Sequence, residues 1–295
     1  MTSPRIAFLV ALVGIGTYSL MDAAMKALSL GHGAYPALWW RSVAGVVLVA
    51  PVFVARGGRW PARRILALHL QRGVPATCSG LLFFWGLARV PIAQAVALTF
   101  PIPLMAMFLG WLLLGEPLTR AALLGAAIAA GGVGVIALGQ SAAGVADPLG
   151  TLALLGAALF YAVSLIALRR QAQAASAIEV TLFTGLIFVL LLSLGAGADA
   201  LAGGTLGLAR TPALGDLPLI VAAGLLGSVS AVLLAWAYAR AGAGLLSLTE
   251  YSAFLWGALL GWLFFGERVS LFTAGGAALI IAGCLVGLRQ AKESR

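Results

Sequence analysis

Apolar segments of membrane-spanning length follow one another along almost the whole chain. A helix needs about 20 apolar residues, and at least about 17, to cross the hydrocarbon core of a bilayer. Only 9% of the 295 residues are charged and 62% are hydrophobic, whereas a soluble domain carries roughly 25% charged residues. A soluble core cannot hide this much apolar surface, so the sequence predicts an all-α, polytopic membrane protein of ten transmembrane helices. These spans are expected at 5–27, 34–55, 68–88, 91–114, 120–139, 149–168, 177–195, 216–239, 243–265 and 271–289.

The positively charged residues are unevenly distributed between the segments that connect these spans. With the N-terminus inside, 13 of the 18 Lys and Arg residues, Arg72 among them, fall on the cytoplasmic side. The four that fall outside are Lys26, Arg89, Arg210 and Arg268. Arg41 alone is left within a span. Because positively charged loops stay in the cytoplasm, we expect both termini there, in a bacterial-type cytoplasmic (inner) membrane. An even number of spans follows, which agrees with ten.

The chain contains an internal repeat. Residues Trp85–Thr119 align without a gap with Trp236–Ser270, at a constant offset of 151. The match includes a Gly-Trp pair and a Gly-Glu pair, which stand at 110–111 and 115–116 in the first copy. Chance agreement of such residues in one register is improbable, so the repeat indicates a duplicated gene.

The repeat divides the chain into two five-helix units, 1–140 and 149–290. Because five is odd, the second unit enters the membrane from the opposite face. Inverted repeats of this kind are typical of alternating-access transporters, which bind their solute near the bilayer midplane between the two halves. A duplicated scaffold without a transport role is the alternative.

Two short motifs connect the fourth and fifth predicted helices of each unit. They are Gly115-Glu116-Pro117-Leu118-Thr119 and Gly266-Glu267-Arg268-Val269-Ser270. Together with Pro103, thirteen residues before the first glutamate, and with Arg41, they resemble the drug/metabolite transporter superfamily with two tandem EamA domains, and most closely the YddG-type amino-acid exporters. The resemblance implies a central cavity surrounded by helices one, three, four, six, eight and nine, with the last helix of each repeat outside. The second unit departs from the pattern at Phe254, where the family proline would stand, and at Phe183, the equivalent of Arg41.

Charged residues within the predicted spans are the first candidates for a solute site. A charge at this depth costs roughly 2.5–3.5 kcal/mol on insertion scales, so it is paired or faces water. Arg41 is suited to a substrate carboxylate, and Glu250 to a substrate ammonium or a transported proton; fixed internal partners are the alternative for both. Asp22 and Lys26 are four residues apart on one helix, and a structural ion pair between them is favoured over a binding site.

Aromatic and polar residues in the expected cavity helices complete the candidate pathway. Aromatic walls suit an apolar or aromatic solute, although core packing and interhelical hydrogen bonds explain many such residues. The full set expected along the pathway is Tyr18, Asp22, Arg41, Thr77, Gln94, Thr99, Phe100, Tyr161, Ser164, Ser228, Tyr238, Thr249, Glu250 and Tyr251.

Two further groups have expected roles outside the pathway. Pro101 and Pro103 interrupt the backbone hydrogen bonds of the fourth span, as a gating hinge or as a static kink. Glu116 and Glu267 lie where a helix begins, so we expect them to be structural caps that bind free N–H groups.

The sequence favours a secondary transporter over an enzyme. It contains no Walker A loop, so ATP is not expected to drive transport, and it suggests no cofactor, metal or nucleic-acid site. The expected partners are a small-molecule solute and the lipid bilayer, and the oligomeric state is open between monomer and homodimer. The resemblance and the charged and aromatic candidates favour export of amino acids, including aromatic ones. A vitamin, nucleobase or cationic drug is the alternative cargo, and a polytopic enzyme acting on lipid is the alternative class.

Overall fold

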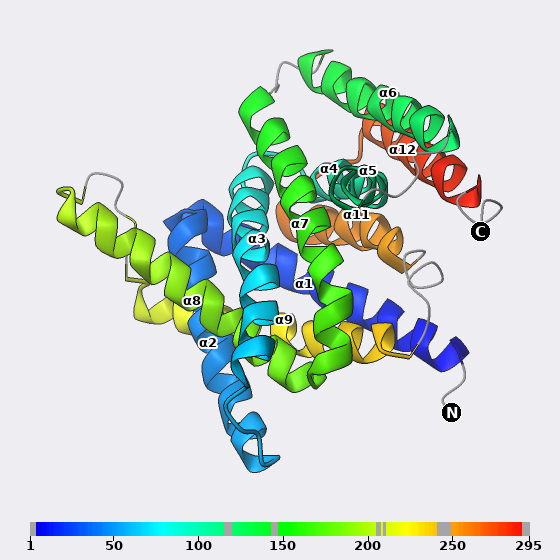
Figure 1. The fold of residues 1–295 in the computed structure, drawn as a ribbon. Helices are drawn as coiled ribbons and strands as arrows, with labels where there is room; N and C mark the ends of the chain where they lie inside the picture. Colours follow the sequence, from blue (N-terminus) through cyan, green and yellow to red (C-terminus); the bar gives the residue numbers. More distant parts are fainter. Residues whose placement is uncertain are drawn as a thin grey trace.

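A computed structural model describes residues 4–114, 120–142, 147–204, 208, 211–240 and 249–290, and this part of the chain is helical throughout, without strands (Figure 1). The helices are α1 (Pro4–His32), α2 (Ala34–Ala55), α3 (Arg63–Leu87), α4 (Ile92–Thr99), α5 (Ile102–Leu114), α6 (Arg120–Ala142), α7 (Pro148–Ala174), α8 (Ala177–Leu201), the short η1 (Leu214–Asp216), α9 (Leu217–Tyr238), α11 (Ser252–Phe265) and α12 (Leu271–Gln290). Among them, α1, α2, α6, α7, α8 and α9 are long and apolar enough to cross a membrane.

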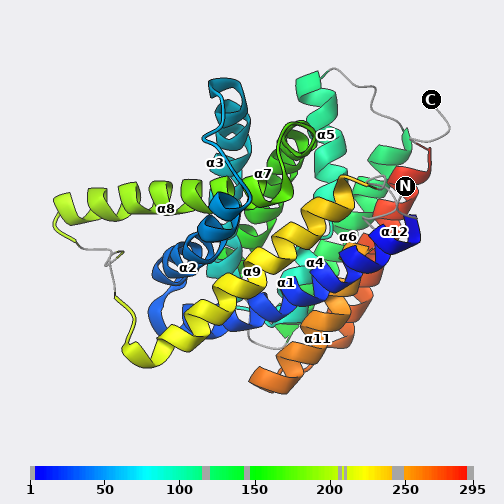
Figure 2. The same cartoon turned by 90° about the horizontal axis from the view of Figure 1, so that it is seen from below.

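The first and second halves of the chain are interleaved. Helix α1 packs along α9, α2 along α8, α3 along α7, and α6 along α12. Figures 1 and 2 show the α6–α12 pair at one side of the molecule and the α1–α9 pair side by side in both views. Each of these contacts joins a helix of the first half to a helix of the second half. The interface between the two halves therefore runs through the centre of the helix bundle.

Several helices extend beyond the apolar segments that predicted them, among them α1 and α3. Helix α1 continues to His32, where Gly33 with a φ of +87° turns the chain into α2. Helix α3 begins at Arg63 rather than at residue 68. Lys26 and Arg72 lie within the expected spans 5–27 and 68–88, where Lys26 is buried and Arg72 faces the cavity, so counting them with the connecting segments was wrong.

The fourth span is broken into α4 and α5 at Phe100 and Pro101. Proline has no N–H group and cannot continue a helical hydrogen-bond ladder, so a new helix starts at Ile102. The second half has a turn at Tyr251, the position that corresponds to Phe100 at the offset of 151. No proline follows there; instead the Ser252 hydroxyl donates to the carbonyl of Thr249 at 2.6 Å. The expected start of the ninth span, 243–248, lies outside the described residues.

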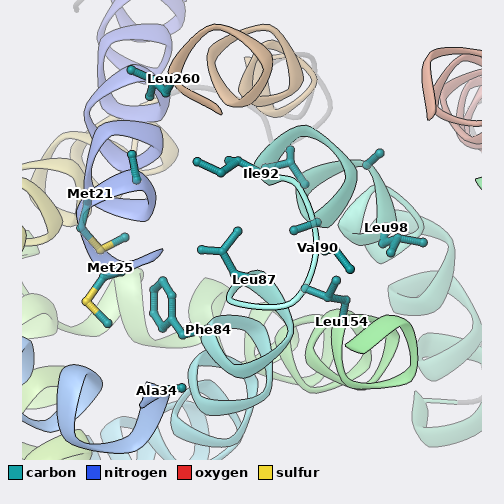
Figure 3. Packing of buried hydrophobic residues seen from close by; sticks show 14 of the residues in the cluster. Met21, Met25, Ala34, Phe84, Leu87, Val90, Ile92, Leu98, Leu154 and Leu260 are labelled. Atoms are coloured by element: carbon teal, nitrogen blue, oxygen red, sulfur yellow. The ribbon is translucent and has the colours of Figure 1, made fainter. Parts of the chain in front are cut away.

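A hydrophobic core joins α1, α3, α4, α7 and α11. Figure 3 shows Met21 and Met25 of α1 near Phe84 of α3. On the other side of this cluster, Leu98 of α4 packs with Leu154 of α7, and all five side chains are almost completely buried. This apolar packing holds the broken α4–α5 segment against the helices that surround the centre.

Small residues allow α6 and α12 to approach closely. A Cβ added at Gly132 would lie 2.6 Å from the carbonyl oxygen of Gly276 and 2.7 Å from Cγ1 of Ile280, whereas a Cβ at the adjacent Gly131 would meet nothing within 4 Å. Glycine at such a contact lets two helix backbones pack directly against each other.

We expect Gly132→Ala to lower the free energy of unfolding by about 1–3 kcal/mol, because the added methyl group forces the two backbones apart. Reversible unfolding of the purified protein in mixed micelles, followed by circular dichroism, measures the change. Gly131→Ala is the matched control, and it should be neutral or slightly stabilising since alanine favours the helix. Equal stability of the two variants would contradict the backbone contact.

Candidate functional site

A cavity of about 310 Å³ lies between the two halves of the chain. Its described walls come from α1, α2, α3, α4, α7, α8 and α9, with contributions from Ile102, from Glu250 and Tyr251, and from Ala253 of α11. Among the described residues, none of those that line the cavity belongs to α6 or α12. The resemblance implied this outer position for the last helix of each repeat. It did not include the second and seventh expected spans, 34–55 and 177–195, which are α2 and α8 and which also line the cavity.

Eleven of the fourteen residues expected along the pathway line this cavity. They are Tyr18, Asp22, Arg41, Thr99, Phe100, Tyr161, Ser164, Ser228, Tyr238, Glu250 and Tyr251. Thr77, Gln94 and Thr249 do not line it and are buried elsewhere. The Thr77 hydroxyl donates to the carbonyl of Gly73, one turn earlier in its own helix, at 2.8 Å, which leaves it a local role.

Arg41 projects from α2 into the cavity between two aromatic rings. Its guanidinium carbon lies 5.6 Å from the ring centroid of Phe84 and 5.9 Å from that of Phe188. The Nη1 atom is 3.1 Å from Sδ of Met21, and Nε has no hydrogen-bond partner. Within the described part of the chain, no carboxylate lies within ion-pair distance of Arg41. The cation is therefore stabilised by aromatic faces and remains free to bind an anion.

Glu250 lies in a cluster of tyrosines. The Tyr238 hydroxyl donates to Oε1 of Glu250 at 2.7 Å, and Tyr161 lies within electrostatic reach of the carboxylate. Tyr251 packs edge-on against Phe100, with ring centroids 5.2 Å apart. This side of the cavity offers an acid and aromatic surfaces to a solute.

Tyr18 lies within electrostatic reach of Asp22, Arg41 and Arg72. It retains 37% of its surface accessible although it lies in the middle of α1, because it faces the open space. Asp22, one turn further along α1, also faces the cavity, and its Oδ1 atom has no hydrogen-bond partner. Both residues lie within electrostatic reach of Arg41.

Arg72 is the functional candidate that the sequence analysis missed. It lines the cavity from α3, where its Nη1 donates to Oε1 of Gln171 at 3.1 Å and to Oγ1 of Thr184 at 3.2 Å. Its Nε has no partner. A signal was present, because Arg72 lies inside the expected span 68–88. Since α3 begins at Arg63, Arg72 is nine residues from its start, about as deep as Arg41 in α2.

Lys26 pairs with Glu267 rather than with Asp22, which corrects the pair expected from sequence spacing. Its Nζ lies 2.5 Å from Oε1 of Glu267 and donates to the carbonyl of Val90 at 2.6 Å. The other carboxylate oxygen of Glu267 accepts the backbone N–H of Ile92 at 2.7 Å. These contacts tie α1, the α3–α4 connection and the α11–α12 connection together.

Glu267 thus binds a free N–H group, as a cap does, but at the start of α4 rather than of the helix that follows it. The hydroxyl of Ser270 accepts the N–H of Thr273 at 3.0 Å at the start of α12. Glu116, the other expected cap, lies outside the described residues. Pro101 lies in the break between α4 and α5, and Pro103 lies in the first turn of α5, where a missing N–H costs nothing.

Comparison with known proteins gives a consistent family match. The model of the "EamA-like transporter family" matches residues 5–138 and 148–289, which confirms the resemblance found in the sequence. The "Pseudopaline exporter CntI" of Pseudomonas aeruginosa is 25% identical over 286 residues, which cover 96% of each chain. The "Riboflavin transporter" of Rhizobium johnstonii is 35% identical over 225 residues, 75% of this chain and 70% of its own. A solved crystal structure with 22% identity aligns with a TM-score of 0.64 over 99% of this chain and 100% of its own, and it supports the fold alone.

Proposed function

Because this chain belongs to the EamA-like transporter family, we propose that it is a secondary transporter that exports amino acids, including aromatic ones, by alternating access through the central cavity. The observation that carries the proposal is the placement of Arg41 and Glu250, two opposite charges, on one aromatic-lined cavity. Neither has an ion-pair partner among the described residues. A zwitterion offers the carboxylate and ammonium that these two groups bind, and its apolar side chain suits the aromatic walls.

Ten transmembrane helices in two inverted repeats, 1–140 and 149–290, are the architecture that we propose for this transport. In this arrangement α1, α2, α3 and α5 of the first half correspond to α7, α8, α9 and α11 of the second. The α1–α9, α2–α9 and α1–α11 contacts then have α7–α3, α8–α3 and α7–α5 as their counterparts, and all six contacts occur. The same local contact also recurs: Arg89 stacks on Trp85 at 3.4 Å and Arg240 on Trp236 at 4.1 Å. Such reciprocity supports two halves that exchange conformations during transport.

We place the protein in a bacterial-type inner membrane with both termini in the cytoplasm. With Arg72 and Lys26 set aside, the 13 cations assigned to the cytoplasmic side become 12 and the 4 assigned to the outside become 3. Arg56, Arg59 and their neighbours in the α2–α3 connection are exposed, as a cytoplasmic loop would be. Because the family comprises transporters and the sequence contains no Walker A loop, we propose transport that is not driven by ATP and that involves no enzymatic reaction.

A vitamin is the second candidate cargo, because one relative at 35% identity is a riboflavin transporter. A flavin ring system would stack on the aromatic walls around Phe100 and Tyr251. The other relative is an exporter of pseudopaline, so the two names give no common cargo, although both are transporters.

Counterflow into proteoliposomes tests the proposal directly. Vesicles loaded with unlabelled amino acids should take up labelled amino acids with saturation, and phenylalanine and tyrosine should be among those exchanged. Vesicles without protein are the blank. Saturable riboflavin exchange without amino-acid exchange by the same well-folded protein would replace the amino-acid proposal with the vitamin, and conductance without saturation would indicate a channel.

A further inference from the structure

The cavity contains two guanidinium groups, and the proposed function uses only Arg41. Arg72 makes its two hydrogen bonds to neutral acceptors, Gln171 and Thr184. Its Nε has no partner, and the ion pairs found across the described ranges do not include it. Burial of a charge is costly unless an opposite charge or a set of hydrogen bonds compensates it. A guanidinium with free donors on a cavity wall is therefore a position for an acidic group of the solute.

A chain of hydrogen bonds orients Arg72 without neutralising it. The amide nitrogen of Gln171 donates to Nδ1 of His69 at 2.6 Å, so the amide oxygen of Gln171 is left to accept from Arg72. With Nδ1 as an acceptor, the His69 ring carries its proton on Nε2, which lies 3.4 Å from Oε1 of Glu179. Glu179, the acid at the end of this hydrogen-bond chain, is thus separated from the guanidinium by Gln171 and His69, and Arg72 presents its positive charge to the cavity.

The two guanidinium groups face the same stripe of α8. Arg72 donates to Thr184, and Arg41 lies against Phe188. These two α8 residues are four apart, which is about one helical turn or about 6 Å. Tyr18 of α1, which also lines the cavity, lies within electrostatic reach of both arginines. Two guanidinium groups that border one turn of α8 on the same cavity can bind two acidic groups of one small molecule, and guanidinium forks bind carboxylates with two parallel hydrogen bonds.

The acids of the cavity do not occupy these positions. Glu250 accepts its hydrogen bond from Tyr238. Asp22 has a free Oδ1 atom, and it is not within ion-pair distance of either arginine. Both acids therefore remain free to bind a substrate amine while the two arginines bind acidic groups.

We propose that Arg72 forms a second anionic subsite and that the preferred substrates are amino acids with a second carboxylate, one carboxylate bound by Arg41 and the other by Arg72. This inference rests on the proposed function and names the substrate class within it.

Three six-carbon probes separate the contributions to binding. Norleucine and 2-aminoadipate have the same chain and the same amine, and they differ only in the terminal methyl or carboxylate group. Adipate has both carboxylates and no amine. Isothermal titration calorimetry on the purified full-length protein in detergent micelles measures the affinity of each probe for the wild type, for Arg72→Gln and Arg72→Lys, and for Arg59→Gln, which removes an exposed charge in the α2–α3 connection.

The wild type and Arg59→Gln should bind 2-aminoadipate at least about tenfold more tightly than norleucine. Arg72→Gln should reduce this ratio to about one, and Arg72→Lys should leave an intermediate ratio because the charge remains without the fork. A ratio near one in the wild type, or a ratio that survives Arg72→Gln, would overturn the subsite; a purely structural Arg72 would weaken both probes equally and leave the ratio intact.

The experiment also separates the subsite from the amino-acid proposal. If the wild type binds adipate, loses it in Arg72→Gln, and binds neither amino acid, then the amino-acid proposal fails and the subsite stands. If none of the three probes binds to well-folded protein, the subsite fails as well.

Discussion

Arg41→Ala should lower the transport rate for amino acids at low substrate concentration by about 100-fold. The guanidinium faces the cavity between the rings of Phe84 and Phe188, where water screens charges poorly. Loss of one partner of a buried charge pair costs about 2–5 kcal/mol, and about 3 kcal/mol corresponds to roughly 100-fold. The fold should survive, because no acid of the described chain loses an ion pair when Arg41 is removed.

Initial rates of counterflow, normalised to the amount of folded protein in the vesicles, measure this effect. Arg59→Ala removes the same charge from the exposed α2–α3 connection and should transport like the wild type. Glu250→Gln is the companion variant: glutamine still accepts the hydrogen bond of Tyr238, so a comparable loss of rate would come from the missing charge. Wild-type rates in Arg41→Ala would remove this arginine from the substrate site.

Glu267→Ala should lower the free energy of unfolding by about 3–5 kcal/mol, the typical cost of leaving one member of a buried ion pair alone. The Lys26 side chain is only 6% exposed and that of Glu267 16%, so water cannot replace the lost partner. The variant also leaves the N–H of Ile92 at the start of α4 without its acceptor, which adds a desolvation cost.

Reversible unfolding in mixed micelles measures this loss, and two control variants locate its origin. Arg268→Ala changes the adjacent, exposed residue and should be neutral. Lys26→Met combined with Glu267→Gln removes both charges and keeps an acceptor for Ile92, so the double variant should recover most of the stability. A double variant as unstable as Glu267→Ala would show that the charge pair is not the cause.

The candidate site was predictable in part, because a charged residue inside a long apolar segment can be recognised from the sequence alone. Arg41 and Glu250 interrupt long apolar runs, and such residues face cavities or partners rather than lipid. Their aromatic neighbours Tyr238 and Tyr251 followed from the helices that carry them. The sequence could not show which face of each helix points inward, and Thr77 and Gln94, which occupy pore helices, are buried away from the cavity.

The misplaced residues share one physical cause. Lys26 and Arg72 lie near the ends of the expected spans 5–27 and 68–88, where a charged residue is readily counted with the connecting segment. Their positions are stabilised by partners far away in the chain: Glu267 is 241 residues from Lys26, and Gln171 is 99 residues from Arg72. The spacing of four residues between Asp22 and Lys26 allows a local ion pair, but Lys26 pairs with the distant Glu267 instead.

The sequence by itself determined the class of the protein and its family. Apolar segments of spanning length allow only a structure that satisfies every backbone hydrogen bond within the segment, which is the helix, and the repeated Gly-Glu motifs indicate the EamA-like family. The tertiary structure alone decided which polar groups meet. The turn at Tyr251 without a proline, the Lys26–Glu267 pair and the entry of Arg72 into the cavity all depend on contacts between helices that are distant in sequence, because a buried charge or a broken helix is stable only where another part of the chain supplies its partner.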